Sequence, residues 1–225
     1  MKIILSPAKK MNVDTDKVEV LSKPVCLDKT EVILTWLRSK SRDELKKLWG
    51  CNDKIAEQNF NRIENMDLYK QLTPAVIAYD GIAYQYMAPA VFEDGHFEYV
   101  QEHLCILSAF YGVLRAMDGV APYRLEMQAK AAIDDNKNLY DFWGRDLYDA
   151  VMDDRYITIT FCEKSGDKLV TKATYAKMAR GEMVRYMAEK HIETPEEIRN
   201  FDRLGYIYRA DISSDSEYVF ERILV

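Results

Sequence analysis

The sequence predicts a mixed α/β (α+β) fold, with a central mixed sheet flanked by helices in one domain spanning residues 1–225. The chain is 48% hydrophobic and 30% charged over 225 residues, which is enough to build a sizeable core without disulfides or metals. Short apolar runs ended by Gly or Pro alternate with segments whose apolar residues have helical spacing. No repeat, low-complexity tract or linker indicates a domain boundary.

A short strand and then helices are predicted for the first third of the chain. Residues 2–5 read as a buried strand, because Ser6-Pro7 cannot continue a ladder. Asp28 is placed to cap a helix over residues 30–40. The helical subregion extends over about residues 28–66.

A helix-hairpin-helix-like element is predicted within this subregion, near residues 41–65. Ser41 and Glu44 form a capping-box pattern, and Gly50 is placed to end that helix in a left-handed conformation. Asn52 or Asp53 then caps the next helix.

The remaining elements follow from periodicity and turn residues. We expect helices at 82–92, 97–104, 139–151, 176–190 and 195–201, strands at 75–79, 156–161, 204–209 and 217–224, and a hairpin turn at 165–167 leading into 168–175.

Composition excludes several classes of protein. Lys plus Arg total 31 against 37 for Asp plus Glu, so the net charge is −6, and any site for nucleic acid or another anion must be a local patch. No apolar run approaches the ~20 residues of a membrane span, and no signal peptide is recognisable. We therefore expect a cytoplasmic protein that does not bind membranes.

Cysteine and histidine spacing predicts neither a metal site nor a cofactor. The four cysteines lack Cys-x-x-Cys spacing and are expected to be buried free thiols; they are Cys26, Cys51, Cys105 and Cys162. The histidines form no i,i+4 pair; they are His96, His103 and His191.

The turn around Gly50 is the first candidate site. A tight turn between two helices leaves N–H groups of the second helix facing outward, where they suit a phosphate oxygen, and Lys54 adds positive charge. Asn52 stands where the DNA-backbone helix-hairpin-helix motif usually has its second glycine. An ordinary αα-corner is the alternative.

The loop after the first strand is the second candidate. If Ser6 begins a helical turn, Lys9 lies one turn on and is placed to activate the hydroxyl; Lys9 and Lys10 serve equally as anion ligands. We favour anion binding, because strand-end loops commonly hold ligands.

Residues 108–127 form the third candidate, rich in aromatic and charged residues without surface periodicity. Arg115 and Arg124 each suit a phosphate or carboxylate, with Tyr123 beside Arg124, whereas Asp118 and Glu126 are candidate acids or bases. An internal salt-bridge network is an equally good reading.

The fourth candidate is residues 172–185, with four basic residues against one acidic residue. Lys177, Arg180 and Arg185 are candidate anion ligands on one helix, accompanied by Tyr175 and Tyr186, which suit stacked bases or sugars. A solvated helix face is the alternative.

Together these stretches resemble the YaaA peroxide-stress protein family. The matching pieces run in family order: Ile4–Lys9, Leu107–Arg115, Pro122–Met127, Leu139–Gly144, Ala176–Gly181 and Asp215–Phe220. The resemblance implies a single-domain α/β fold, a positively charged cleft, a helix-hairpin-helix-like element, duplex-DNA binding and a role in limiting free iron during peroxide stress. No established reaction comes with it.

The chain departs from the family pattern after residue 151. Relatives carry an additional strand and helix there, whereas here Val151-Met152 runs directly into Asp153-Asp154-Arg155 and Tyr156-Ile157. We expect an exposed sheet edge and the loss of any cleft residue that this segment supplied.

Three functional hypotheses follow. The first is a cytoplasmic DNA-binding stress protein that holds phosphates in a cationic cleft and does not read base sequence. The second is an enzyme acting on a phosphorylated or carboxylated small molecule, with Asp118 or Glu126 as proton carrier. The third is an iron-handling partner protein. The first two require the scattered cations to converge.

Overall fold

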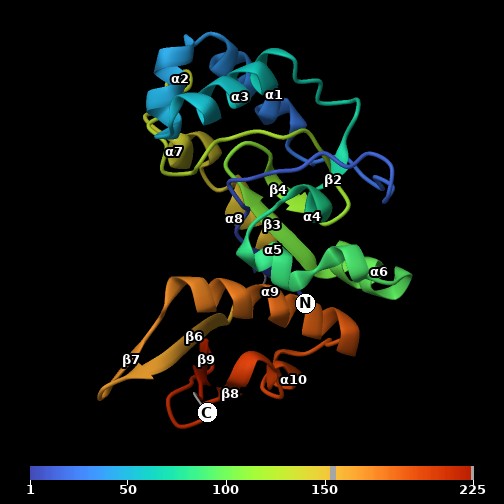
Figure 1. The fold of residues 1–225 in the computed structure, drawn as a ribbon, viewed down its shortest axis with the longest axis vertical. Coiled ribbons are helices and arrows are strands. Elements are labelled where there is room, and N and C mark those ends of the chain that lie inside the picture. The colour runs from blue at the N-terminus through green and yellow to red at the C-terminus, as the bar shows by residue number, and fades with distance from the viewer. Residues whose placement is uncertain (153–155, 224–225) are drawn as a thin grey trace. The chain divides into compact units, whose positions relative to one another are not determined.

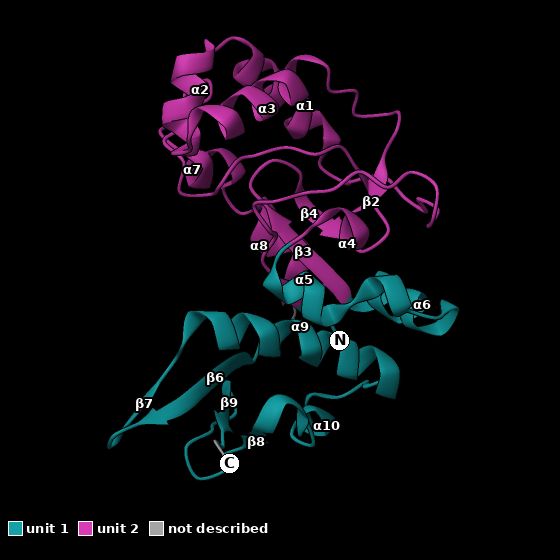
Figure 2. Cartoon of the chain, viewed as in Figure 1, with its two compact units in different colours: residues 1–3, 81–103, 152–225 teal, residues 4–80, 104–151 magenta. Residues whose placement is uncertain are grey.

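The computed structural model describes residues 1–152 and 156–223 and confirms the mixed α/β class (Figure 1). The chain forms two compact units (Figure 2). Unit 1 comprises residues 1–3, 81–103 and 152–225, and unit 2 comprises residues 4–80 and 104–151. Unit 2 therefore contains both the predicted hairpin and the strand-end loop, whereas the long basic helix belongs to unit 1.

Unit 2 contains the first three helices of the chain, and the local signals predicted for the second and third are observed. Its first three helices are α1 (Leu27–Arg38), α2 (Arg42–Trp49) and α3 (Asp53–Glu64). Ser41 and Glu44 form the predicted capping box, and Gly50 ends α2 at φ 55°. The Asn52 side chain accepts a hydrogen bond from the Ile55 amide, so Asn52 is the cap of α3.

The start of α1 differs from the prediction. Cys26 stands at the N-cap without a side-chain hydrogen bond, and Asp28 lies inside the first turn. An acidic residue in a first turn stabilises the helix dipole, so Asp28 favours the helix from within rather than from its cap.

The strands of unit 2 form two small sheets. The order of the first sheet is β1-β3-β4, with β1 at Ile3–Leu5, β3 at Leu104–Ser108 and β4 at Gly112–Arg115. β2 (Thr73–Pro74) pairs with β5 (Gly119–Val120). The predicted helix at 139–151 is divided at Gly144 into α7 (Leu139–Trp143) and α8 (Asp146–Val151).

The predicted strand at 75–79 is wrong, because this segment contains the helical turn α4 (Ala75–Ala78). Its first amides donate to distant carbonyls: Ala75 to Asp118 at 2.9 Å and Val76 to Ala116 at 2.9 Å. A short apolar run does not distinguish a buried strand from a buried helical turn, and these long-range bonds decide between them.

Unit 1 is a mixed four-stranded sheet with helices. The strand order is β7-β6-β9-β8, and only β6 and β9 are parallel. The strands are β6 (Thr158–Ser165), β7 (Lys168–Val170), β8 (Tyr206–Tyr208) and β9 (Glu217–Arg222). The turn between β6 and β7 contains Gly166 at φ 62°, as predicted. Leu224 of the predicted last strand lies outside the described residues.

The helices of unit 1 include most of those predicted. They are α5 (Ile82–Met87), the 3-10 turn η1 (Pro89–Val91), α6 (Asp94–His103), α9 (Ala173–Lys190), α10 (Pro195–Ile198) and the 3-10 turn η2 (Arg203–Gly205). A Cβ atom on Gly181 of α9 would lie 1.8 Å from the Ala83 carbonyl oxygen of α5. Glycine is therefore required where these two helices cross.

Over the described ranges, no helix is long and apolar enough to cross a bilayer.

Candidate functional site

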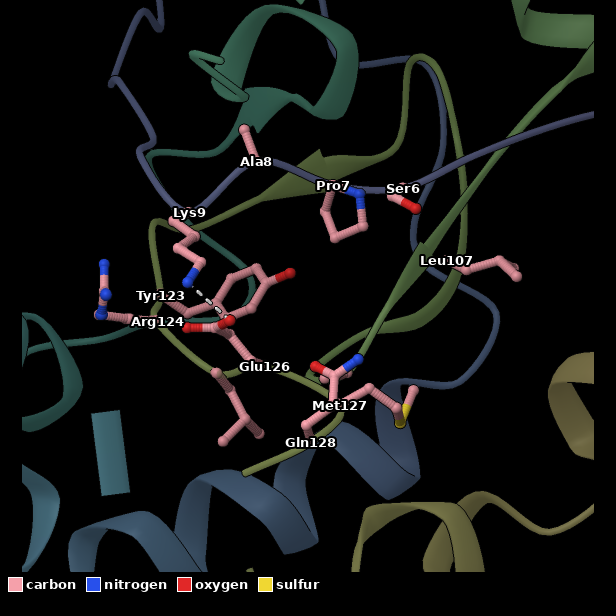
Figure 3. A pocket seen from close by; sticks show the side chains of 12 residues that line it. Ser6, Pro7, Ala8, Lys9, Leu107, Tyr123, Arg124, Glu126, Met127 and Gln128 are labelled. Atoms are coloured by element: carbon pink, nitrogen blue, oxygen red, sulfur yellow. Dashed lines mark ion pairs between the residues drawn. The ribbon is translucent and has the colours of Figure 1, made fainter. Parts of the chain in front are cut away.

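A pocket of about 220 Å³ in unit 2 brings together the second and third sequence candidates (Figure 3). One wall is the loop after β1, residues 6–9, and another is the loop of residues 123–128. Leu107 and Ala109, at the end of β3, complete the lining. Residues 6–9 follow β1 without helical structure, so the condition under which Lys9 would activate the Ser6 hydroxyl is not met. Lys9 is therefore not placed one helical turn from Ser6.

Tyr123 anchors the second loop of the pocket. Its hydroxyl lies 2.7 Å from the Ser108 Oγ and 2.9 Å from the Tyr79 hydroxyl. Its ring stacks on Phe110 with centroids 4.9 Å apart. Burial raises the pKa of Tyr123, so the phenol stays protonated as a structural hydrogen-bonding group.

Ser108 and Tyr79 were not identified from the sequence. Ser108 Oγ also accepts hydrogen bonds from the amides of Phe110 and Tyr111, at 3.1 and 2.9 Å. A serine before a tight turn is a recognisable signal for such bonds. The contact with Tyr79, 44 residues away from Tyr123, has no local signal.

Lys9 and Glu126 face each other across the pocket (Figure 3), with Nζ and Oε2 2.8 Å apart. The Lys9 side chain is 63% exposed and that of Glu126 is 38% exposed. Ion pairs this accessible to water contribute only about 0–1 kcal/mol. Lys9 can therefore exchange the carboxylate for an incoming anion at little cost.

Arg124 differs from Lys9 because it has no carboxylate partner in the described part of the chain. Its Nε is buried and has no hydrogen-bond partner among the described residues. A buried N–H without an acceptor costs about 1–3 kcal/mol. An anion that reaches this N–H after a local rearrangement recovers that cost, so Arg124 is a candidate anion ligand at the pocket.

Two of the other cations of unit 2 lie outside the pocket lining. Lys10 pairs with Asp80. Arg115 is exposed at the end of β4.

Asp118 lies outside the pocket lining as well. It is buried and accepts hydrogen bonds from the Ser22 hydroxyl at 2.6 Å and the Arg115 amide at 2.8 Å. Burial raises the pKa of Asp118 despite these bonds. The observed contacts are those of a residue that fixes the turn between β4 and β5.

The hairpin of α2 and α3 has the predicted helices but a mixed charge. Lys54 is exposed in the first turn of α3, next to Asp53. Asp53 pairs with Lys46 at 2.7 Å, and this ammonium lowers its pKa. The carboxylate therefore occupies the helix start that a phosphate would otherwise approach.

The basic residues of α9 belong to unit 1. Arg185 pairs with Glu189 at 2.7 Å, whereas Lys177 and Arg180 are exposed. The predicted single hollow requires these residues together with Lys9 and Arg124, which belong to unit 2.

The described ranges contain no group of three or more His, Cys, Asp or Glu side chains arranged to hold a metal ion. No disulfide joins any of the four cysteines in the part of the chain that the structure describes. Only Cys162 is fully buried, so the expectation of burial is wrong for Cys26, Cys51 and Cys105. These three lie at intermediate exposure.

Comparison with known proteins identifies the family. The profile described as "Peroxide stress protein YaaA" matches residues 1–155 and 149–212. This chain belongs to the YaaA family. The YaaA match covers both units and includes every residue that lines the pocket of unit 2.

Curated relatives agree over nearly the whole chain. A UPF0246 protein of Agathobacter rectalis is 63% identical over 246 residues, covering 99% of each chain. UPF0246 proteins of Pediococcus pentosaceus and Lachnoclostridium phytofermentans are 48% and 46% identical over 244 residues. These alignments cover 98% of this chain and 97% and 96% of the two relatives.

The comparisons also indicate that this chain lacks an internal segment that its relatives have. The two YaaA matches meet at residues 149–155, and the alignment with the Agathobacter protein is 21 positions longer than the 225 residues of this chain. At least that many positions of the relative therefore have no counterpart here. Residues 153–155 of this junction lie outside the described residues.

Proposed function

We propose that this protein acts in the response to peroxide stress by binding double-stranded DNA through its phosphate backbone, and thereby helps to limit free iron. Membership of the YaaA family supports the stress role. The observation that carries the binding proposal is the buried, unpartnered Nε of Arg124 in the pocket of unit 2.

The chemistry of the pocket suits a phosphate group. Arginine offers planar N–H donors that match phosphate oxygens, and Lys9 adds a mobile positive charge. The volume of about 220 Å³ lies below the 300–1,000 Å³ typical of drug-sized ligand pockets. A single phosphodiester group fits that limit better than a large metabolite does.

The hairpin of α2 and α3 supplies a second, weaker contact in this proposal. Lys54 is its exposed cation, and the Asp53 carboxylate beside it repels a phosphate. We therefore assign the larger share of binding to the pocket.

A salt titration tests the proposal. Wild-type protein is titrated into fluorescent duplexes of two unrelated sequences between about 50 and 200 mM salt, where a binder making several phosphate contacts loses affinity steeply. Both duplexes should bind alike. Absent binding at low salt, or binding indifferent to salt, would contradict the proposal.

Variants then assign the binding to the pocket. Arg124→Ala should weaken duplex binding about tenfold, as expected for a charged hydrogen bond of about 1.4 kcal/mol or more. Lys168→Ala removes an exposed lysine of the β6–β7 hairpin in unit 1 and serves as the matched control. Equal losses in both variants would indicate nonspecific attraction.

The iron role requires a cellular measurement. Chelatable iron is measured after peroxide addition in cells lacking the protein, then supplied with wild type or Arg124→Ala. The proposal expects wild type alone to lower the iron signal. If Arg124→Ala lowers it equally, iron limitation does not depend on this pocket.

An enzyme acting on a phosphorylated or carboxylated small molecule is the second candidate function. It is favoured by Glu126, a carboxylate that faces Lys9 within a concave site beside Arg124. In this reading Lys9 and Arg124 hold the anionic group and Glu126 carries the proton. A metabolite that raises the melting temperature of wild type, but not of Arg124→Ala, would support it over DNA.

A further inference from the structure

Unit 1 contains a second pocket, of about 250 Å³, that the preceding proposal does not use. It is lined by Tyr175 and Met178 of α9, Leu204 of η2, Tyr206 of β8 and Arg222 of β9. None of these residues was singled out as a ligand from the sequence, apart from Tyr175 as an aromatic neighbour of the basic residues. The lining is mainly aromatic and aliphatic, with one cation.

Tyr206 provides the polar group of this pocket. The residue is only 2% exposed, and its ring packs edge-on against Phe161 with centroids 5.0 Å apart. Within the described residues, the Tyr206 hydroxyl has no hydrogen-bond partner, unlike the hydroxyls of Tyr79, Tyr99, Tyr111 and Tyr123. Burial raises the pKa of Tyr206, so this hydroxyl keeps its proton and can donate it to a ligand.

Tyr175 and Arg222 are stacked on each other in the lining of this pocket. The Arg222 guanidinium lies 4.0 Å from the centroid of the Tyr175 ring, at stacking distance. Planar rings stack on both arginine and aromatic side chains, and the bases of nucleic acids are bound in this way. Met178 adds a flexible, polarizable side chain that can pack against a pyrimidine or a purine ring.

The charged side chains next to Arg222 carry a net positive charge that attracts an anionic group. The buried carboxylate of Glu163 is shared by Lys172 and Arg222, the latter at 3.7 Å. Two cations for one carboxylate leave one positive charge in excess. Lys172 is 54% exposed and can therefore meet a phosphate in solvent.

We propose that this pocket binds the base of a nucleotide, with the ring against Tyr175 and Arg222, an acceptor atom on the Tyr206 hydroxyl and the phosphate near Lys172. A stacked arginine–tyrosine pair, one unpartnered donor and a surplus positive charge together suit a nucleotide. A cavity of 150 Å³ already holds benzene, so about 250 Å³ accommodates a heterocyclic base. The site is separate from the pocket of unit 2 and does not depend on duplex binding.

Tyr206→Phe tests the hydroxyl while keeping the ring that packs on Phe161. Calorimetric titration of the full chain with adenosine monophosphate should show binding, weakened about tenfold in Tyr206→Phe. Tyr208→Phe is the matched control in the same strand, because Tyr208 packs on Tyr218 and Phe220 and does not line the pocket. Its affinity should equal that of wild type.

A nucleotide reaches this pocket either as part of a nucleic-acid strand or as a free metabolite. Two different probes distinguish these cases. A single-stranded oligonucleotide with one unpaired 2-aminopurine reports the base of a polymer, and adenosine monophosphate reports a free metabolite. Quenching of 2-aminopurine in wild type but not in Tyr206→Phe assigns the pocket to the polymer; binding of the monophosphate alone assigns it to the metabolite. Inorganic phosphate should bind at least tenfold more weakly than adenosine monophosphate.

Three outcomes would overturn the proposal. They are no binding of either probe by wild type at millimolar concentration, equal affinity in Tyr206→Phe and wild type, or equal binding of inorganic phosphate and the nucleotide. Near-ultraviolet circular dichroism of Tyr206→Phe checks that its packing is retained. Arg124→Ala should leave nucleotide binding unchanged, so failure of the duplex proposal and failure of this one give different results.

Discussion

The two pockets differ in which polar group lacks a partner. In unit 2 the Tyr123 hydroxyl is bonded on both sides, while the Nε of Arg124 is buried without an acceptor. In unit 1 the guanidinium of Arg222 is engaged by Glu163 and Tyr175, while the Tyr206 hydroxyl is left without a bond in the described residues. The pocket of unit 2 therefore suits an anionic ligand, and the pocket of unit 1 suits a planar ring that carries a hydrogen-bond acceptor.

The largest expected effect breaks the packing of α9, the helix that supplies Tyr175 and Met178 to the pocket of unit 1. Gly181→Ala places a Cβ atom against the Ala83 carbonyl and forces α5 and α9 apart, at a cost of about 3 kcal/mol. Urea unfolding measures the loss. Gly166→Ala is the control, because no atom lies within 4 Å of its added Cβ and only its left-handed backbone is strained, costing about 1 kcal/mol. Equal costs would contradict the close helix contact.

The next effect tests the hydrogen-bond network that Ser108 forms beside the pocket of unit 2. Ser108→Ala removes the acceptor for the amides of Phe110 and Tyr111 and a partner of the Tyr123 hydroxyl, at a cost of about 2 kcal/mol. Thermal unfolding measures it. Ser39→Ala, an exposed serine that donates to the Trp36 carbonyl, should cost less than 0.5 kcal/mol by comparison, as surface changes do. A neutral Ser108→Ala would show that the loop does not depend on this network.

A smaller effect concerns Asp118, a buried carboxyl of unit 2. Its pKa is raised above 3.8 in the folded protein, so the native state takes up a proton before the unfolded state does as the pH falls. Wild type should gain stability relative to Asp118→Asn as the pH is lowered through the raised pKa toward 3.8. Urea unfolding at several pH values measures this difference, and a constant difference would indicate that the pKa is unshifted.

The smallest effect tests the hairpin. Lys54→Ala should reduce duplex affinity by no more than about threefold, because one exposed phosphate contact contributes little and Asp53 opposes it. Fluorescence anisotropy at low salt measures it beside Arg124→Ala. A loss larger than that of Arg124→Ala would move the main contact from the pocket to the hairpin.

Local signals in the sequence predicted the helix ends well. The capping box at Ser41 and the left-handed Gly50 depend on neighbours within a few residues, and both are observed. The helical turn at Ala75 was predicted as a strand, because its amides are satisfied by carbonyls 40 or more residues away. Local patterns carry no information about such bonds.

The same distinction applies to the candidate sites. Lys9, Tyr123, Arg124 and Glu126 were selected from the sequence and do line one pocket. Asp118 was selected for its chemistry, whereas its bonds to Ser22 and Arg115 are those of a structural residue. Tyr206 gave no signal, because its ring is positioned by packing against Phe161, which is 45 residues away in the chain.

The salt dependence of duplex binding by Arg124→Ala tests the central claim most directly. The slope of log affinity against log salt should be smaller in magnitude by about 1 than that of wild type, because one phosphate contact is lost. Affinity at low salt should fall about tenfold. Identical slopes and affinities for the two proteins would contradict the assignment of the unit 2 pocket to DNA.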